Sequence, residues 1–204
     1  CPLSRRRVCP ARLVPGRWAG GGGTALALAA AVGNTGQIYA YASAARRLTD
    51  TIRRGDRAGV RNLQVRSPVN PDPLAGLEGK MDVVFIDAPC SGSGSWRRHP
   101  DTKWRLSPEA LERRMADQDA VLDTGATFAK VGGRLIYVTC SILPREDEDR
   151  VEAFLARQDG GFVVQPATDR PELSAFLTPQ GFLRLTPAGA KTDGFFVAVL
   201  ERAR

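Results

Sequence analysis

Strand-like and helix-like stretches of apolar residues alternate along this chain from residue 18 onward. Short apolar runs bounded by turn residues predict strands, and longer amphipathic stretches predict helices. We expect helices over residues 24–32, 43–58, 107–130 and 144–156. We expect strands over residues 37–41, 63–66, 81–86, 134–139, 162–164, 182–185 and 195–200.

The order of these segments predicts the fold. The run MDVVFI at residues 81–86 is apolar without interruption, which favours burial on both faces of a sheet. Strands that alternate with helices form parallel sheets, so we predict an α/β fold with a doubly wound, mostly parallel sheet. No long helix separates the last two strands, which indicates an antiparallel edge.

Turn residues set several boundaries. Ser107 is a helix cap followed by proline in the first turn, and two glycines at residues 132–133 predict a turn into the next strand. The helix over 144–156 carries three acids, at residues 146–148, in its first turn, where they favour the positive end of the helix dipole.

Composition limits the classes of binding partner and the cellular setting that we expect. With 204 residues, the chain can build one domain with a core, and its net charge of +7 favours nucleic acid, although a solvated basic face is an equal alternative. The four cysteines form no CxxC pair and His99 is the only histidine, which argues against a metal site and a disulfide framework. No apolar run approaches the roughly 18 residues of a membrane span, and no signal peptide is visible, so we predict a reduced, cytoplasmic setting.

The first 17 residues differ from the rest. They mix arginine, proline and cysteine without strand or helix periodicity, as a disordered basic arm does. The chain begins with Cys1 rather than Met, so we interpret it as a fragment. We divide it into an atypical segment, 1–17, and a single domain, 18–204.

Two glycine-containing stretches are candidate ligand loops. The first lies before the helix over 24–32, where glycines let a backbone approach a ligand, although a tight packing turn is the alternative; it comprises Gly20, Gly21, Gly22 and Gly23. The second, DAPCSGSG at residues 87–94, follows a buried strand at the carboxyl edge of the sheet, where open α/β folds bind ligands. There Asp87 supplies a carboxylate and Cys90 a thiol.

A second thiol, Cys140 in VTCSILPRE, ends another predicted strand. Neighbouring parallel strands would bring Cys90 and Cys140 together at one edge without a cross-link, which favours chemistry over two buried structural cysteines. The loop RRHPDTKW follows Cys90, and its basic residues can hold phosphates: Arg97, Arg98 and Lys103. Its ring side chains could stack on a base: Trp96, His99 and Trp104. An exposed basic loop is the alternative.

These motifs, with YVTCSILPREDE and TDGFFVAVLER, resemble the successive motifs of the Nop/Sun family of RNA cytosine-5 methyltransferases over about residues 18–204. The resemblance implies a Rossmann-like class I methyltransferase fold with a reversed last strand, S-adenosylmethionine as cofactor, and RNA as partner, ribosomal RNA first and transfer RNA as the rival. It implies that Cys140 is the nucleophile, that Cys90 assists product release, and that Asp87 contacts the cytosine beside the cofactor. The glycine loop, with Ala19 before it, would hold the cofactor.

The chemistry of methylation at carbon 5 of cytosine explains why two thiols are needed. A thiolate that adds to carbon 6 of cytosine makes carbon 5 reactive, and after methyl transfer the proton at carbon 5 and the cysteine must both leave. A free thiol with pKa about 8.5 is only partly ionised at neutral pH, so we expect basic surroundings to help. DNA cytosine-5 methyltransferases use a Pro-Cys nucleophile, which would favour Cys90, but they read Pro-Cys-Gln where this chain has Pro89, Cys90 and Ser91.

The cofactor end departs from the family pattern. Where the family reads D-x-C-A-x-P-G-G-K-T, Gly16, Trp18 and Thr24 replace the Asp, Cys and Lys, and Ala42 stands where an acid would bind the cofactor ribose. One hypothesis is that residues 1–17 are a translation in the wrong frame or otherwise not native. The other is a natural relic that binds RNA without methylating it.

Overall fold

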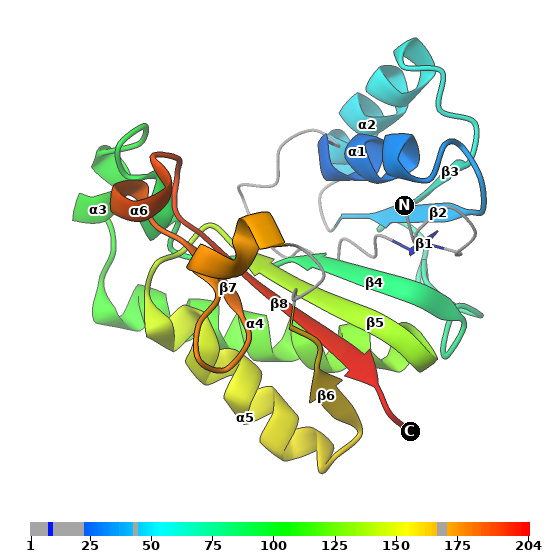
Figure 1. The fold of residues 1–204 in the computed structure, drawn as a ribbon. Coiled ribbons are helices and arrows are strands. Elements are labelled where there is room, and N and C mark those ends of the chain that lie inside the picture. Colours follow the sequence, from blue (N-terminus) through cyan, green and yellow to red (C-terminus); the bar gives the residue numbers. More distant parts are fainter. Residues whose placement is uncertain (1–7, 10–22, 43–44, 167–170) are drawn as a thin grey trace.

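The computed structural model describes residues 8–9, 23–42, 45–166 and 171–204 (Figure 1). Its strands are β1 (Val8–Cys9), β2 (Ile38–Tyr41), β3 (Leu63–Arg66), β4 (Met81–Asp87), β5 (Ala129–Thr139), β6 (Phe162–Val164), β7 (Leu183–Leu185) and β8 (Phe195–Arg202). Its α-helices are α1 (Gly23–Ala31), α2 (Ala45–Arg57), α3 (Asp101–Trp104), α4 (Pro108–Phe128), α5 (Glu148–Gln158) and α6 (Pro187–Ala190). Short 3-10 turns cover Ser93–Ser95, Pro144–Glu146 and Pro171–Phe176.

The main sheet has the strand order β1-β4-β5-β8-β6, and β7 also pairs with β8. β1, β4 and β5 are parallel, with Val8 opposite Val83. β8 runs antiparallel to β5, with Ala198 opposite Tyr137. β2 and β3 form a separate parallel pair. This mostly parallel sheet with a reversed C-terminal strand confirms the predicted Rossmann-like α/β fold.

Helices cover both sides of the strands. Figure 1 shows α4 and α5 on one side and α1 and α2 on the other. Val84 and Ile86 of β4 belong to the larger core cluster, whereas Val83 packs with Ala29 in a second cluster, so β4 is buried on both faces as predicted. A Cβ at Gly125 would lie 2.5 Å from Ile86 Cδ1, so the glycine lets α4 lie close against β4.

β8 lies inside the sheet rather than at its edge. One side of β8 pairs with β5, and the other side is shared by β6 and β7. Phe162 lies opposite Arg202 near one end of β8, and Leu185 lies opposite Phe195 at the other end. The predicted antiparallel edge is therefore present, and within it β8 has strands on both sides because β6 and β7 share its second side.

The start of β5 also differs from the prediction. The strand begins at Ala129, and the pairing jumps from Met81 opposite Ala129 to Val83 opposite Arg134. Gly132, with φ of 72°, lies in this irregular stretch. The glycine pair at residues 132–133 therefore forms a bulge within the strand and not a turn before it.

Three other differences concern loops and helix ends. The stretch from DAPCSGSG through the RRHPDTKW loop contains a 3-10 turn at Ser93–Ser95 and α3. Helix α5 begins only at Glu148, after a 3-10 turn at Pro144–Glu146, and the acids at 146–148 are all buried. β1 lies within the segment that was predicted to have no regular structure. The first two residues of the helix expected over 43–58 lie outside the described residues, and the domain boundary after residue 17 stays a prediction.

In the part of the chain that the structure describes, no helix combines the length and the apolar character needed to cross a membrane.

Candidate active site

The two cysteine motifs begin side by side at the carboxyl edge of the sheet. β4 ends at Asp87, which lies opposite Val138 of β5, and the backbone N–H of Ala88 donates to the Val138 carbonyl at 2.9 Å. Because the strands are parallel, both loops leave the same edge, and Cys90 Sγ lies 3.4 Å from Cys140 Sγ. Both cysteines are free. The prediction of two adjacent, uncrosslinked thiols is confirmed.

The environment makes the two thiols unequal. The hydrogen bond to Cys140 raises the pKa of Cys90 well above its ordinary value, and burial raises it further. The same hydrogen bond lowers the pKa of Cys140, against burial and against the negative charge of Asp87. The surroundings therefore favour the protonated form at Cys90 and the thiolate form at Cys140.

Basic surroundings are not the main cause of the lowered Cys140 pKa, contrary to our expectation. The lowering of the Cys140 pKa comes first from the neighbouring thiol, while Asp87 and Glu146 oppose it. Arg98 interacts electrostatically with Cys140. The pKa of Arg98 is raised, first by its hydrogen bond to Asp193 and to a smaller degree by the charge of Cys140.

A contact between two glycines holds the Cys90 loop against the segment before β8. The N–H of Gly94 donates to the Cys140 carbonyl at 2.9 Å, and the N–H of Gly194 donates to the Gly94 carbonyl at 2.8 Å. A Cβ at Gly94 would lie 2.7 Å from the Gly194 Cα, so a side chain does not fit there. The TDG and CSGSG motifs are thus in direct backbone contact.

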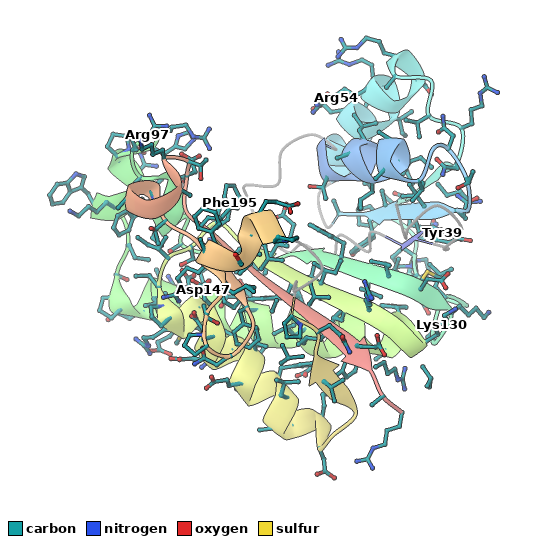
Figure 2. The ribbon with its side chains drawn as sticks, in the orientation of Figure 1. Tyr39, Arg54, Arg97, Lys130, Asp147 and Phe195 are labelled. Atoms are coloured by element: carbon teal, nitrogen blue, oxygen red, sulfur yellow. The ribbon has the colours of Figure 1, made fainter. Side chains whose placement is uncertain are left out.

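The predicted RNA-binding residues lie beside this contact. Figure 2 shows Arg97 at the end of the molecule that carries α3 and α6. Arg97 is largely exposed, Arg98 Nε donates to Asp193 Oδ2 at 2.6 Å, and His99 is half-buried. Lys103 Nζ lies 5.9 Å from the Trp96 ring centroid and 5.4 Å from that of Trp104, which is 81% exposed. The roles of Arg97, Arg98, His99 and Lys103 stay predictions.

The pattern of apolar residues did not identify two buried acids behind the thiols. Glu146 and Asp147 are predicted only as acids in the first turn of a helix, and in the structure both side chains are fully buried. Gln118 of α4, which donates to Glu146 Oε1 at 3.2 Å, was also missed. The sequence did offer a signal for Gln118. It stands three positions after Met115, and residues at that spacing share one face of a helix, here the face toward the core.

Asp147, labelled in Figure 2, makes hydrogen-bond and ionic contacts that are separate from those of Glu146. Its Oδ1 accepts a hydrogen bond from the Thr139 hydroxyl at 2.6 Å, and Arg184 Nη2 of β7 lies 3.8 Å from Oδ2. Arg184 also forms an ion pair with Glu148. Burial is the main reason why the pKa of Asp147 is raised to about 7, a rise that the Thr139 hydrogen bond opposes.

Only part of the predicted cofactor site lies among the described residues. Ala19, Gly20, Gly21 and Gly22 fall outside them. Gly23 begins α1, and no atom of a described residue lies within 4 Å of the position of a Cβ there. Ala42, which follows β2, is buried with 4% exposure, and Asp87 lies at the end of β4. Among the described residues, no group of three or more His, Cys, Asp and Glu is placed to hold a metal ion.

A doubly wound sheet with a reversed last strand, and functional loops at the carboxyl ends of its central strands, define a Rossmann-like methyltransferase domain. S-adenosylmethionine is the cofactor of this class. The model of the 16S rRNA methyltransferase RsmB/F family matches residues 17–201, and the chain belongs to that family. Membership of this family is consistent with the resemblance of the sequence motifs to the Nop/Sun family.

Individual relatives agree with this family. The chain is 30% identical over 185 residues to the probable ribosomal RNA small subunit methyltransferase B of Synechocystis sp., covering 89% of this chain and 41% of that protein. It is 31% identical over 176 residues to ribosomal RNA small subunit methyltransferase F of Serratia proteamaculans, covering 86% and 37%. The crystal structure of PH0851 superimposes with a TM-score of 0.81 at 29% identity, covering 98% of this chain and 44% of that one. The chain thus spans less than half the length of each of these three relatives.

Proposed function

We propose that this chain transfers a methyl group from S-adenosylmethionine to carbon 5 of a cytosine in ribosomal RNA, through a covalent bond from Cys140. The observation that carries the proposal is the pair of free thiols, 3.4 Å apart, at the carboxyl edge of the sheet. Membership of a family of 16S rRNA methyltransferases supports RNA as the substrate. Two adjacent thiols support cytosine carbon 5 as the target, because that carbon needs a covalent nucleophile to activate it.

The two thiols take different parts in the reaction. Cys140 Sγ bonds to carbon 6, and the electron pair of the 5,6 double bond makes carbon 5 nucleophilic. The cofactor supplies the methyl group. Water then takes the proton from carbon 5, the electron pair of that C–H bond re-forms the 5,6 double bond, the C6–S bond breaks, and Cys140 recovers its electron pair. Cys90, whose Sγ lies 3.4 Å from the Cys140 sulfur, assists this release.

Other side chains bind and orient the base. Asp87, at the end of β4, hydrogen-bonds the cytosine edge and stabilises the activated ring in this proposal. The cytosine must be unstacked or single-stranded to reach the sulfurs. Arg97 and Lys103 supply positive charge for the RNA backbone, and the exposed Trp104 supplies a stacking surface.

Two cysteine variants test this mechanism. Full-length chain, ribosomal RNA and cofactor are incubated, and 5-methylcytosine is measured by mass spectrometry while a denaturing gel reports protein bound to RNA. We expect Cys140→Ala to abolish both product and adduct, and Cys90→Ala to leave a covalent adduct that does not resolve. Glu152→Ala, at an exposed position of α5, is the control. If the Cys140 variant accumulates the adduct instead, the two roles are reversed.

The buried Ala42 favours a second candidate, an RNA-binding relic of the same fold. No carboxylate stands there for the cofactor ribose, and a lost buried hydrogen bond costs about 1–3 kcal/mol. Calorimetric titration with S-adenosylmethionine separates the candidates. We expect binding if the chain methylates RNA; no detectable binding, with RNA affinity retained, would identify the relic.

A further inference from the structure

The carboxylate of Glu146 lies fully buried between the two cysteine loops. Its Oε1 accepts hydrogen bonds from the backbone N–H of Ser91 at 2.7 Å and from Gln118 Nε2 at 3.2 Å. Its Oε2 accepts from the hydroxyls of Ser91 at 2.5 Å and Ser141 at 2.6 Å. A buried carboxylate is costly unless its oxygens are satisfied, and here each oxygen accepts two hydrogen bonds.

These donors belong to the neighbours of the two thiols. Ser91 follows Cys90 directly, and Ser141 follows Cys140. We propose that Glu146 is a positioning residue, whose single carboxylate ties the Cys90 loop to the Cys140 loop and so fixes the separation of the two sulfurs. The proposal rests on the function proposed above for the thiols, but the geometry can be tested without it.

Glu146 is itself held in place. The Tyr137 hydroxyl donates to the Glu146 backbone carbonyl at 2.8 Å and fixes it against β5. Gln118, besides its bond to the carboxylate, donates to the Pro89 carbonyl at 2.8 Å, so the residues on both sides of Cys90 are held by one network. An anchored carboxylate can set a distance, whereas an exposed one would move with solvent.

The positions of the two sulfur atoms matter because the rate of covalent catalysis depends on the geometry of the reacting groups. A misplacement of about 1 Å at a reacting group can cost about 100-fold in rate. The charge of Glu146 has a second effect: the pKa of Cys90, raised first by its hydrogen bond to Cys140, is raised further by this nearby negative charge. Glu146 therefore also helps to keep the proton on Cys90.

Two substitutions distinguish the effect of the Glu146 hydrogen bonds from the effect of its negative charge. In Glu146→Gln, the amide oxygen can still accept from the Ser91 N–H, and the amide nitrogen can donate to the hydroxyls of Ser91 and Ser141, which rotate to accept. Glu146→Ala removes all the hydrogen bonds that the carboxylate accepts, while the backbone bond from Gly94 to Cys140 remains. Glu152→Ala, at an exposed position of the following helix α5, is the matched control.

The first measurement uses the free, full-length chain without RNA or cofactor. Diamide joins two adjacent thiols by taking up their two hydrogens, and peptide mass spectrometry follows the rate at which Cys90 and Cys140 become linked. We expect Glu146→Gln and Glu152→Ala to react within about twofold of the unchanged chain. We expect Glu146→Ala to react about tenfold more slowly. Equal rates for Glu146→Ala and the unchanged chain would overturn the proposal.

The second measurement is methylation of ribosomal RNA. We expect Glu146→Ala to lower kcat about 100-fold with little change in KM for RNA, because the tie affects the reacting atoms and not RNA binding. We expect Glu146→Gln to recover most of that loss, and a Gln variant as impaired as the Ala variant in both measurements would overturn the proposal. If the unchanged chain makes no 5-methylcytosine, the proposed function fails while the diamide rates still decide the positioning role.

Ser141→Ala keeps the test decisive if Glu146→Ala does not fold. It removes one tie to the Cys140 loop and leaves the carboxylate with its hydrogen bonds to Ser91 and Gln118. We expect a folded protein, checked by circular dichroism, whose thiols link about threefold more slowly. An unchanged linking rate would contradict the proposal.

Discussion

Replacing Asp147 with Asn should remove a large pH dependence of the free energy of unfolding. The Asp147 side chain is fully buried, and its Oδ1 accepts the Thr139 hydroxyl at 2.6 Å. Among the described residues, Oδ2 has no hydrogen-bond partner and lies 3.8 Å from Arg184 Nη2. Burial without full compensation disfavours the charged form, which is the main reason why the pKa rises from 3.8 to about 7.

The sign follows from where the proton binds. Between about pH 4 and 7, the folded chain holds a proton on Asp147 that the unfolded chain has released. The folded state thus binds more protons, so the free energy of unfolding falls as pH rises through this window. A pKa difference of about three units corresponds to about 4 kcal/mol, fully expressed above pH 7 and absent below pH 4.

Urea unfolding at a series of pH values measures this effect. Asn keeps an oxygen for the Thr139 hydroxyl but cannot ionise, and other titrating groups cancel when the two proteins are compared. We expect the unchanged chain to lose about 3 kcal/mol relative to Asp147→Asn between about pH 5 and 8.5. Two unfolding curves that run parallel over that range would refute the reasoning.

Two further predictions concern the loop that carries Cys90 and the surface beside it. Gly94→Ala forces a Cβ to within 2.7 Å of the Gly194 Cα, so we expect a loss of about 2–3 kcal/mol in urea unfolding and a lower kcat; an unchanged unfolding midpoint would contradict the contact. Trp104→Ala removes a side chain that is 81% exposed, so we expect stability within about 0.5 kcal/mol but RNA affinity about tenfold weaker in a filter-binding assay. Equal affinity would exclude Trp104 as a stacking surface.

Local sequence patterns were sufficient for several elements. β3 spans the predicted residues, and the predicted cap of α4 is present, since the Ser107 hydroxyl oxygen accepts from the Ala110 N–H at 3.2 Å. The unbroken apolar run of β4 correctly indicated burial on both faces. These features depend on periodicity and capping, which residues close in the sequence determine.

The meeting of the two thiols was also predictable, for a topological reason. Two cysteines that follow neighbouring parallel strands must leave the same edge of the sheet, although they are 50 positions apart. Their inequality was not predictable in the same way. It arises from their mutual hydrogen bond and from their burial beside acids, which need the packed structure.

The sequence by itself thus determined the α/β class, most elements and the edge at which the chemistry lies. The tertiary structure alone decided that β8 lies inside the sheet, because β6 and β7 share its second side. It also decided that the acids at residues 146–148 face inward. In isolation they fit the exposed start of a helix, but Glu146 meets its donors at Ser91, 55 positions away, and at Gln118, 28 positions away. A carboxylate is buried only where such distant donors converge, and no local pattern records that convergence.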